Sequence, residues 1–250
     1  MREAGGEEHS LAEAGLHPCQ VFDLGLQQYR ETLQLQKTLQ QARIDGTIPE
    51  SVLVLQHYPV ITLGKSGNRD NVIATEELLT DKGIPIADSD RGGDVTFHNP
   101  GQLVAYLIFD LSCVYGAKCG EVIYKYVRDV EEVVLRVLAD FDLVGYRVPE
   151  HPGVWLRGGK VCGIGLNIRH GVSSHGLALN VNNDLRMSSY IYSCGIRDAT
   201  AISMSQALGR QLSVAEVLPF LLTHLSDIFS LAIERGVERL PAALALPCES

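Results

Sequence analysis

The chain has 250 residues, of which 46% are hydrophobic and 20% are charged, a composition typical of a globular protein with a sizeable core. Its formal net charge is −9, from 21 basic and 30 acidic side chains. We therefore do not expect nucleic acid as a partner, because phosphate binding needs concentrated lysine and arginine. Since no apolar run approaches the roughly 20 residues that span a bilayer, we expect no membrane association.

The cysteines and the chain ends favour a cytoplasmic protein with reduced thiols. Residues 1–17 are polar and acidic and lack the basic-then-apolar order of a signal peptide. We predict a tail over 1–17, one folded domain over 18–238 and a second tail over 239–250. The cysteines show neither C-x-x-C spacing nor the density of a small disulfide-stapled domain: Cys19, Cys113, Cys119, Cys162, Cys194 and Cys248.

The first half of the chain predicts one helix and three strands. Apolar residues recur at near-helical spacing from Leu26 to Leu39, and Gly46 can end the helix, so we predict a helix over 24–45. Short apolar runs between turn signals predict the strands, over 51–56, 61–64 and 103–111.

The second half returns to helical spacing over 120–142. A hairpin is predicted from 153–156 and 160–168, joined at 157–159, because Gly-Gly accepts the positive φ of a tight turn. A further strand is predicted over 175–181. Ser213 and Glu216 form a capping-box pattern that opens a helix, which Gly236 can close. Adjacent strands interrupted by a few helices indicate a single α+β domain on a mixed or antiparallel sheet flanked by helices.

Cys194 follows Lys160 by 34 positions (194 − 160), across a segment rich in glycine, asparagine and histidine. A thiol is a strong nucleophile as the thiolate, and a nearby ammonium keeps it ionised near neutral pH. The pair therefore suggests covalent acyl transfer, with backbone N–H groups near Cys194 as donors to an oxyanion. A buried structural cysteine and a solvated lysine are the ordinary alternatives.

Cys162 is a rival nucleophile. It lies two residues after Lys160 in a predicted strand, and the period of two places both side chains on one face. Against this assignment, a strand leaves no unpaired N–H groups for an oxyanion, and apolar burial raises the pKa of a thiol.

The segment 91–98, Arg-Gly-Gly-Asp-Val-Thr-Phe-His, is expected to be a loop. It lacks the G-x-x-x-x-G-K-[ST] and G-x-G-x-x-G spacings of phosphate loops, and a simple hairpin turn is the alternative. His98 and His175 have no partner at metal-ligand spacing, so we interpret both as hydrogen-bonding walls of a pocket and predict no metal.

Glycines also mark two of the predicted strands, at Gly163 and Gly165 and again at Gly176. Such glycines either serve packing or let a ligand or a backbone approach closely.

Four strings of the sequence together resemble the lipoyl(octanoyl) transferase family. They are Arg-Gly-Gly-x-x-Thr-x-His-x-Pro-Gly-Gln at 91–102, Lys-Val-Cys-Gly-Ile-Gly at 160–165, Ser-His-Gly-Leu-Ala-Leu-Asn-Val at 174–181 and Cys-Gly-Ile at 194–196. That family moves an octanoyl group from acyl carrier protein to a lysine of a lipoyl domain. The resemblance implies that 18–238 is the octanoyltransferase catalytic domain, with the α+β fold shared by biotin and lipoate ligases.

The resemblance also implies roles for individual residues. Cys194 is expected to carry the acyl thioester, and Lys160 to lower the pKa of that cysteine. The acyl pocket is expected to be lined by Arg91, Gly92, Gly93, Asp94, Val95, Thr96, Phe97, His98, Gly163, Ile164, Gly165, Gly176, Leu177 and Ala178.

The implied partners are acyl carrier protein, the lipoyl domains of 2-oxoacid dehydrogenase E2 subunits and the glycine cleavage H protein. Neither ATP nor a metal is expected, because the donor on the phosphopantetheine arm is already an activated thioester. Both protein substrates in this family are acidic, as is this chain. Docking is therefore expected to use local basic residues, with Lys65, Arg69, Arg91, Arg147, Arg157 and Arg169 as candidates.

Three positions depart from the family pattern without removing a catalytic group: Asn99, Ser193 and Ala201 stand where the family mostly has Gly, Pro and Ser. Three alternative functions stay open. They are an ATP-dependent lipoate or biotin ligase, an amidotransferase that passes the chain between lipoyl domains, and a binding module without catalysis.

Overall fold

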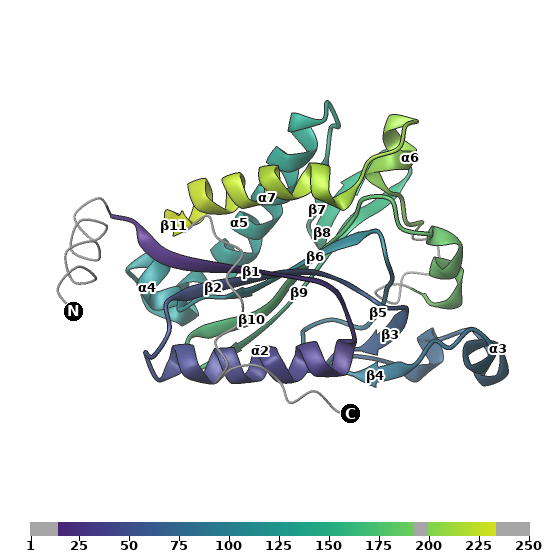
Figure 1. Cartoon of the computed structure of the whole chain (residues 1–250), viewed down its shortest axis with the longest axis horizontal. Coiled ribbons are helices and arrows are strands. Elements are labelled where there is room, and N and C mark those ends of the chain that lie inside the picture. The colour runs from purple at the N-terminus through teal and green to yellow at the C-terminus, as the bar shows by residue number, and fades with distance from the viewer. Residues whose placement is uncertain (1–14, 193–199, 234–250) are drawn as a thin grey trace.

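The computed structural model describes residues 15–192 and 200–233 and centres on one mixed, eight-stranded sheet (Figure 1). Its strands are β1 (His17–Gln27), β2 (Glu50–His57), β6 (Gln102–Ile108), β7 (Tyr146–Val148), β8 (His151–Leu156), β9 (Gly159–Arg169), β10 (Val172–Asn180) and β11 (Leu231–Ile233). They lie in the order β11-β1-β2-β6-β10-β9-β8-β7. β1 is parallel to both of its neighbours, and the remaining pairs are antiparallel.

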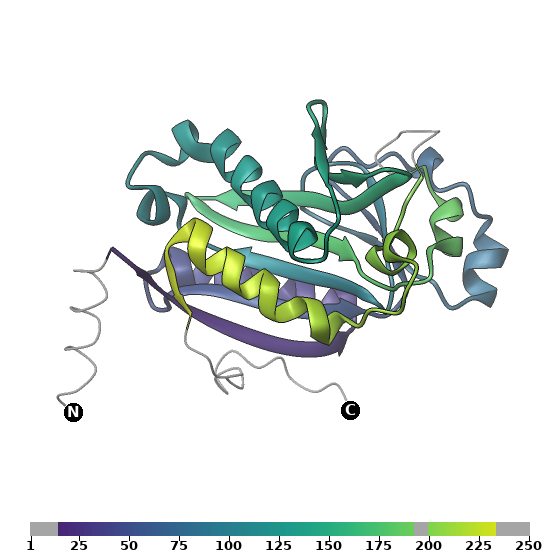
Figure 2. The same ribbon diagram turned by 90° about the horizontal axis from the view of Figure 1, so that it is seen from above.

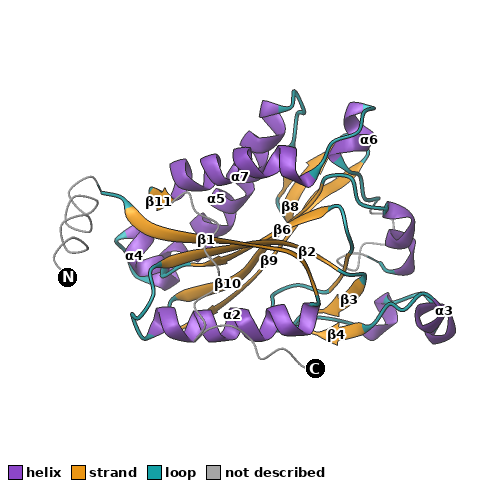
Figure 3. Ribbon diagram, in the orientation of Figure 1, coloured by secondary structure: helices purple, strands orange, loops and turns teal. Residues whose placement is uncertain are grey.

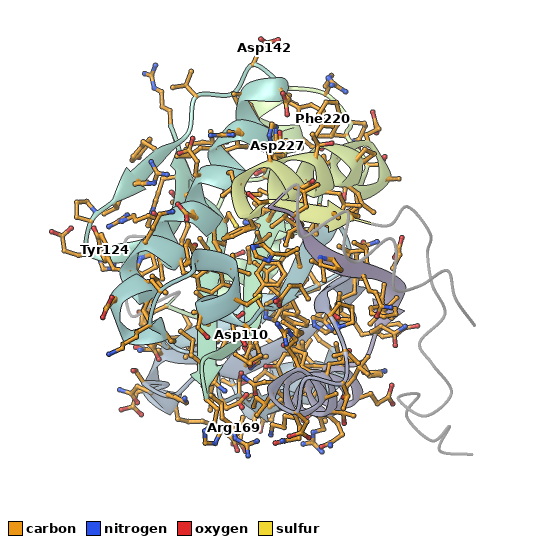
Figure 4. The ribbon with its side chains drawn as sticks, turned by 90° about the vertical axis from the view of Figure 1, so that its left-hand side faces the viewer. Asp110, Tyr124, Asp142, Arg169, Phe220 and Asp227 are labelled. Carbon is orange, nitrogen blue, oxygen red and sulfur yellow. The ribbon has the colours of Figure 1, made fainter. Side chains whose placement is uncertain are left out.

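Helices cover both faces of this sheet (Figures 1 and 2). On one face lie α4 (Leu111–Tyr115), α5 (Cys119–Asp140) and α7 (Val214–Phe229), and on the other lies α2 (Tyr29–Ile44). Figure 4 shows the outer sides of α5 and α7, where Tyr124 and Phe220 are labelled and exposed. This arrangement confirms the predicted α+β class, with a mixed sheet flanked by helices.

The central strand β6 shows why both faces are covered. Alternate side chains of a strand point to opposite faces, and an apolar strand must be buried on both. Leu103, Ala105 and Leu107 pack in the core with α5 and α7, whereas Val104 and Ile108 pack in the core with α2.

A second, three-stranded sheet lies beside the main one, in the order β4 (Ile86–Asp88), β3 (Val60–Leu63), β5 (Val95–His98) (Figure 3). β5 runs antiparallel to β3 and corrects the expectation of a loop over all of 91–98. Val95 and Phe97 alternate into a small core with Ile61. The sequence does contain this period of two, but the glycines just before it favoured the prediction of a loop.

The predicted helix over 24–45 is wrong at its start. Residues up to Gln27 belong to β1, and the helix begins only at Tyr29. Gly25 has a φ of 63°, at a β-bulge between Asp23 and Gly25, and Gln28 is extended. These backbone conformations exclude a helix there, although Leu26 fits the helical spacing.

The capping box at Ser213 is confirmed by reciprocal hydrogen bonds with Glu216. The predicted end of that helix is wrong, because α7 stops at Phe229 with Ser230 in the left-handed conformation, and β11 follows. Gly236 lies outside the described residues.

The other predicted elements are confirmed, with ends shifted by at most three residues, including the hairpin of β8 and β9. The remaining helices are α3 (Glu76–Asp81), α6 (Met204–Leu208) and two 3₁₀ turns, η1 (Arg69–Asn71) and η2 (Leu185–Tyr190). β1 begins one residue inside the predicted tail over 1–17, and residues 239–250 are not described. Within the described ranges, none of the helices combines the length and the hydropathy that a membrane span requires.

Candidate active site

Two cavities meet beside the N-terminal end of β9, and both are lined by Thr96, Lys160, Gly163 and Ala178. The polar cavity is further lined by amide and hydroxyl side chains, among them Gln102, Asn180, Asn183 and Ser188. The glycine-lined cavity is further lined by Gly92, Gly93, Gly165 and Gly176, and by aromatic and histidine side chains. Each predicted site residue that the structure describes lines one of these cavities, so three separate segments, 91–98, 160–165 and 176–178, come together here.

Lys160 is held at the junction of the cavities along its whole length, and it is buried. Its N–H donates to the carbonyl of Thr200 at 2.8 Å, and its carbonyl accepts from the N–H of Ile202 at 3.1 Å. Its Nζ donates to the carbonyl of Pro152 at 2.9 Å and lies 5.6 Å from the centroid of the Trp155 ring. The ammonium is therefore directed by a carbonyl and an aromatic face.

Cys162 does not share a face with Lys160, so that prediction is wrong. β8 pairs Val154 with Cys162 but Trp155 with Lys160, which leaves Val161 as the extra residue of a β-bulge. Both Val161 and Cys162 pack in the core with α5, whereas Lys160 lines the cavities. Burial raises the pKa of the Cys162 thiol to about 12, which disfavours a thiolate there.

Cys194 lies outside the described residues, as does Ser193. The described residues on either side of that segment are anchored at the polar cavity. Ile191 on one side, and Thr200 and Ala201 on the other, line that cavity. Ala201 also pairs with Lys160 in a parallel bridge.

Arg91 is buried, and its side chain links β3 to the residues that follow Arg91 in the chain. Its Nη2 donates to the carbonyls of Thr62 and Asp94, at 2.9 and 2.8 Å, and to Thr62 Oγ1 at 2.9 Å. Because Arg91 is enclosed among these acceptors, it is poorly placed to dock a protein partner.

Of the other predicted docking residues, Lys65, Arg69 and Arg147 have side-chain partners, and Lys65 Nζ donates to Asn167 Oδ1 at 2.7 Å. Arg147 donates to the carboxylates of Glu131 and Glu132, and Arg69 pairs with Glu76. Arg157 and Arg169 are exposed, and β9 separates them. Arg157 lies in the turn before β9, next to Gly158, whose carbonyl accepts from Thr200 Oγ1 at 2.6 Å. Of the two, Arg157 is thus the one near the polar cavity.

The three strand glycines serve different purposes. Apart from its two chain neighbours, no described heavy atom lies within 4 Å of the position that a Cβ would take on Gly163, so this glycine leaves open space at the junction. A Cβ on Gly176 would lie 2.2 Å from the carbonyl oxygen of Ala105, so this glycine lets β6 approach β10. A Cβ on Gly165 would meet the Arg91 side chain at 3.1 Å.

The wall of the glycine-lined cavity includes aromatic residues that the sequence did not single out. Tyr29 and Tyr106 line the cavity beside His98 and His175, and the ring of His57 packs against three of these rings. Ring centroids separate His57 from Tyr29, His98 and Tyr106 by 5.3, 5.5 and 5.9 Å. These residues come from different elements without a shared spacing, so no local signal could have grouped them.

These buried histidines are held neutral. Desolvation by burial lowers the pKa of His57 to about 4 and that of His98 to about 3, and it lowers the pKa of His175 as well. His57 Nδ1 lies 3.1 Å from the carbonyl oxygen of Gln27, which only a protonated Nδ1 can use, so neutral Nε2 accepts from the Tyr106 hydroxyl at 2.7 Å. Among the described residues, no group of three His, Cys, Asp or Glu side chains could hold a metal ion.

Asn99, the departure from glycine in the family pattern, has a structural account. Its Nδ2 donates to the carbonyl of Asp184 at 2.8 Å, and its Oδ1 accepts from Asn183 at 3.0 Å. Asn183 also donates to Asn180, which accepts from Gln102 at 2.9 Å. Asn99 therefore ties the turn after β5 to η2 and to the wall of the polar cavity.

The fold is shared with lipoate and biotin protein ligases. A lipoate-protein ligase A bound with ATP superposes with a TM-score of 0.73 over 91% of both chains, at 16% identity. A biotin protein ligase from Aquifex aeolicus in complex with biotin and ATP gives a TM-score of 0.52 over 85% of this chain and 70% of that one, at 12% identity. At such low identity these likenesses establish the fold alone.

The sequence comparisons are more specific. A family model described as the lipoyl protein ligase A/B catalytic domain matches residues 28–226. An octanoyltransferase of Koribacter versatilis is 40% identical over 92% of this chain and 93% of its own, and one of Chloroflexus aurantiacus is 43% identical over 88% and 97%. The chain therefore belongs to the lipoyl protein ligase A/B catalytic domain family, and these two relatives are acyltransferases.

Proposed function

We propose that this protein transfers an octanoyl group from acyl carrier protein, through a thioester on Cys194, to a lysine of a lipoyl domain. The observation that carries the proposal is the position of Lys160, which is buried at the junction of the two cavities and paired with Ala201. The acceptors that we expect are lipoyl domains of 2-oxoacid dehydrogenase E2 subunits and the glycine cleavage H protein. The relatives named octanoyltransferase support this reaction class.

In the first half-reaction, the Cys194 thiolate attacks the carbonyl carbon of the octanoyl thioester. The bond from carbon to the pantetheine sulfur breaks, and the departing sulfur takes a proton from the Lys160 ammonium. Free pantetheine thiol, acyl-Cys194 and a neutral Lys160 result. The oxyanion that forms in this step needs N–H donors aimed at it, as in other acyl transfers.

In the second half-reaction, the amine of the acceptor lysine attacks the acyl-Cys194 carbonyl. Lys160 takes the proton that the amine loses, and the Cys194 thiolate leaves. This restores the starting pair of thiolate and ammonium. Because a thioester is converted to an amide, the transfer is downhill and needs neither ATP nor a metal.

The two cavities suit the two ends of the donor. The glycine-lined cavity can take the octanoyl chain, since Gly163 leaves open space where this cavity meets the polar one. The polar cavity, with its amides and hydroxyls, can take the polar arm that carries the thioester.

Intact mass after mixing the protein with octanoyl acyl carrier protein, in buffer freed of nucleotide, tests the proposal. We expect one octanoyl adduct, located at Cys194 by peptide mapping and absent from Cys194→Ala. An adduct on Cys162 would overturn the assignment of the nucleophile. Strict dependence on ATP and magnesium would indicate a ligase, and transfer only from octanoylated lipoyl domains would indicate an amidotransferase.

A further inference from the structure

Glu131 is a fully buried carboxylate in the middle of α5. It lies among valines of the helix face that packs on the sheet, such as Val130 and Val134. A buried charge costs several kcal/mol unless partners and hydrogen bonds satisfy it. Its position therefore needs an explanation.

Ion pairing accounts for only part of the environment of Glu131. Its Oε2 accepts from Arg128 Nη1 at 2.7 Å and from Arg147 Nε at 3.1 Å. The next residue, Glu132, pairs with Arg147 at 2.7 Å and with Arg136 at 3.2 Å while it is about one-third exposed. Pairing with these arginines thus does not require a buried carboxylate.

The other carboxylate oxygen of Glu131 accepts a hydrogen bond that Glu132 does not share. Glu131 Oε1 accepts from the backbone N–H of Gly153 at 3.0 Å. The carbonyl of the same peptide group belongs to Pro152, and it accepts from Lys160 Nζ at 2.9 Å. In a trans peptide the N–H and the C=O point in opposite directions, so one planar group lies between the carboxylate and the ammonium.

A peptide group in this position is polarised from both sides. The carboxylate draws the N–H, which raises the negative charge on the carbonyl oxygen, and hydrogen bonds in a chain strengthen one another in this way. The carbonyl then holds the ammonium more firmly. Gly153 itself is required, because its φ is 132° and a Cβ there would lie 2.6 Å from Lys160 Cε.

We infer that Glu131 is a positioning residue for the reaction, which orients Lys160 through the peptide group between Pro152 and Gly153. The inference rests on the role proposed above for Lys160. Among the described residues, the charged and titratable groups around Glu131 are Arg128 and Glu132 on its own helix, Arg147 on β7, and Lys160 and the Cys162 thiol on β9.

The direction of one pH shift separates positioning from a simple field effect. A carboxylate that acts only through its field disfavours a nearby thiolate, so its removal should lower the pH at which the catalytic cysteine becomes reactive. A carboxylate that positions Lys160 helps to stabilise the thiolate, so its removal should raise that pH. The two explanations therefore predict opposite signs.

Two variants of the full chain use this difference. Glu131→Gln removes the charge, whereas Glu131→Asp keeps the charge and the pairing with arginine but withdraws the carboxylate from Gly153 by one carbon, about 1.5 Å. We expect both to raise the midpoint pH of iodoacetamide alkylation at Cys194 by about one pH unit. Glu132→Gln, which weakens the same arginine cluster without touching Gly153, should leave the midpoint unchanged.

A lower midpoint in Glu131→Gln with no change in Glu131→Asp would overturn the inference. Equal midpoints in Glu131→Gln, Glu131→Asp and Glu132→Gln would overturn it as well. Lys160→Met is the reference. If it fails to raise the midpoint, the proposed role of Lys160 is wrong, whereas a shift in Lys160→Met alone refutes only the role of Glu131. Because Glu131→Asp retains the charge, it keeps the test available if Glu131→Gln does not fold by circular dichroism.

Discussion

The polar cavity and the glycine-lined cavity share Lys160 but surround it differently. On one side lie amides that bond to one another, such as Gln102 and Asn180. On the other side lie glycines, which have no side chain, and an aromatic wall whose histidines are neutral. Under the proposed transfer, this difference assigns a direction to the donor, because an acyl chain gains from the apolar side and the arm that carries it gains from the polar side. In that proposal, the reacting carbonyl is expected where the two cavities meet, beside Lys160.

The largest expected effect follows from the residue at that meeting point. Lys160→Met keeps much of the bulk but removes the ammonium, and we expect octanoyl transfer at pH 7 to fall by about 10²- to 10⁴-fold. Transfer should recover partly as pH rises, because a cysteine without help forms thiolate near a pKa of about 8.5. The measurement is the pH profile of transfer, with circular dichroism to confirm the fold.

Lys160→Arg separates charge from proton transfer. Guanidinium supplies a positive charge but does not give up its proton, so this variant should rescue transfer poorly while alkylation of Cys194 stays fast. Full transfer by Lys160→Arg would refute the proton-accepting role, and unchanged alkylation in Lys160→Met would refute the stabilisation of the thiolate.

The glycines give the next largest effect, as a matched pair. Gly163→Val should fill open space at the junction and reduce transfer of octanoyl about 10- to 100-fold relative to acetyl, with little loss of stability. Gly176→Ala should instead press on the Ala105 carbonyl, cost about 1–3 kcal/mol of unfolding free energy and affect both donors alike.

Rates with octanoyl and acetyl thioesters, together with thermal unfolding, distinguish the two glycine variants. If Gly163→Val slows both donors equally, the octanoyl chain does not pass the junction, and the direction assigned to the substrate is wrong.

The contrast between these glycines also shows what the sequence could and could not predict. The hairpin of β8 and β9 and the capping box at Ser213 depend on neighbours in the chain, so local patterns predicted them correctly. Gly163 and Gly176 look alike in sequence, and only the position of β6 separates their purposes.

A single residue accounts for the main error within the site. The bulge at Val161 turns Cys162 into the core and leaves Lys160 at the cavities, and period-2 reasoning has no means to anticipate an extra residue. The segments around Lys160 that the resemblance grouped do come together at the two cavities, because a family resemblance carries three-dimensional information that periodicity lacks. Tyr29 and His57 were missed, since no string that carries the resemblance includes them.

The pH dependence of the unfolding free energy tests whether the histidines around the glycine-lined cavity are neutral. For His57 and His98 the folded-state pKa values, about 4 and 3, lie below the ordinary 6.5. The unfolded chain then binds more protons than the folded one between these values. The contribution of each neutral histidine to the unfolding free energy is fully present above pH 6.5. It is lost as pH falls toward 4, by up to roughly 1.4 kcal/mol per pH unit.

His57→Gln, which can still bond to Tyr106, should reduce this pH slope of the unfolding free energy by up to one histidine's share. Urea unfolding at several pH values between 7 and 4 measures the slope. Identical slopes in the two proteins would show that His57 is not held neutral.

The smallest expected effect concerns how a protein donor reaches the polar side. β9 has 11 residues and spans roughly 35 Å, so Arg157, in the turn before it, and Arg169, its last residue, cannot serve one small docking site. Figure 4 shows Arg169 at the lower edge of the molecule. Arg157 instead adjoins the polar cavity through Gly158 and Thr200. Arg157→Gln should therefore raise the KM for octanoyl acyl carrier protein about two- to fivefold, and Arg169→Gln should not. The rate of transfer from a small octanoyl thioester should not change in either variant.

Raising the salt concentration should slow transfer from the protein donor more than from the small thioester, since the Debye length falls to roughly 3 Å at 1 M. Arg157→Gln should reduce that difference in salt sensitivity. Equal effects of the two arginines would mean that no local basic site beside the polar cavity guides the donor.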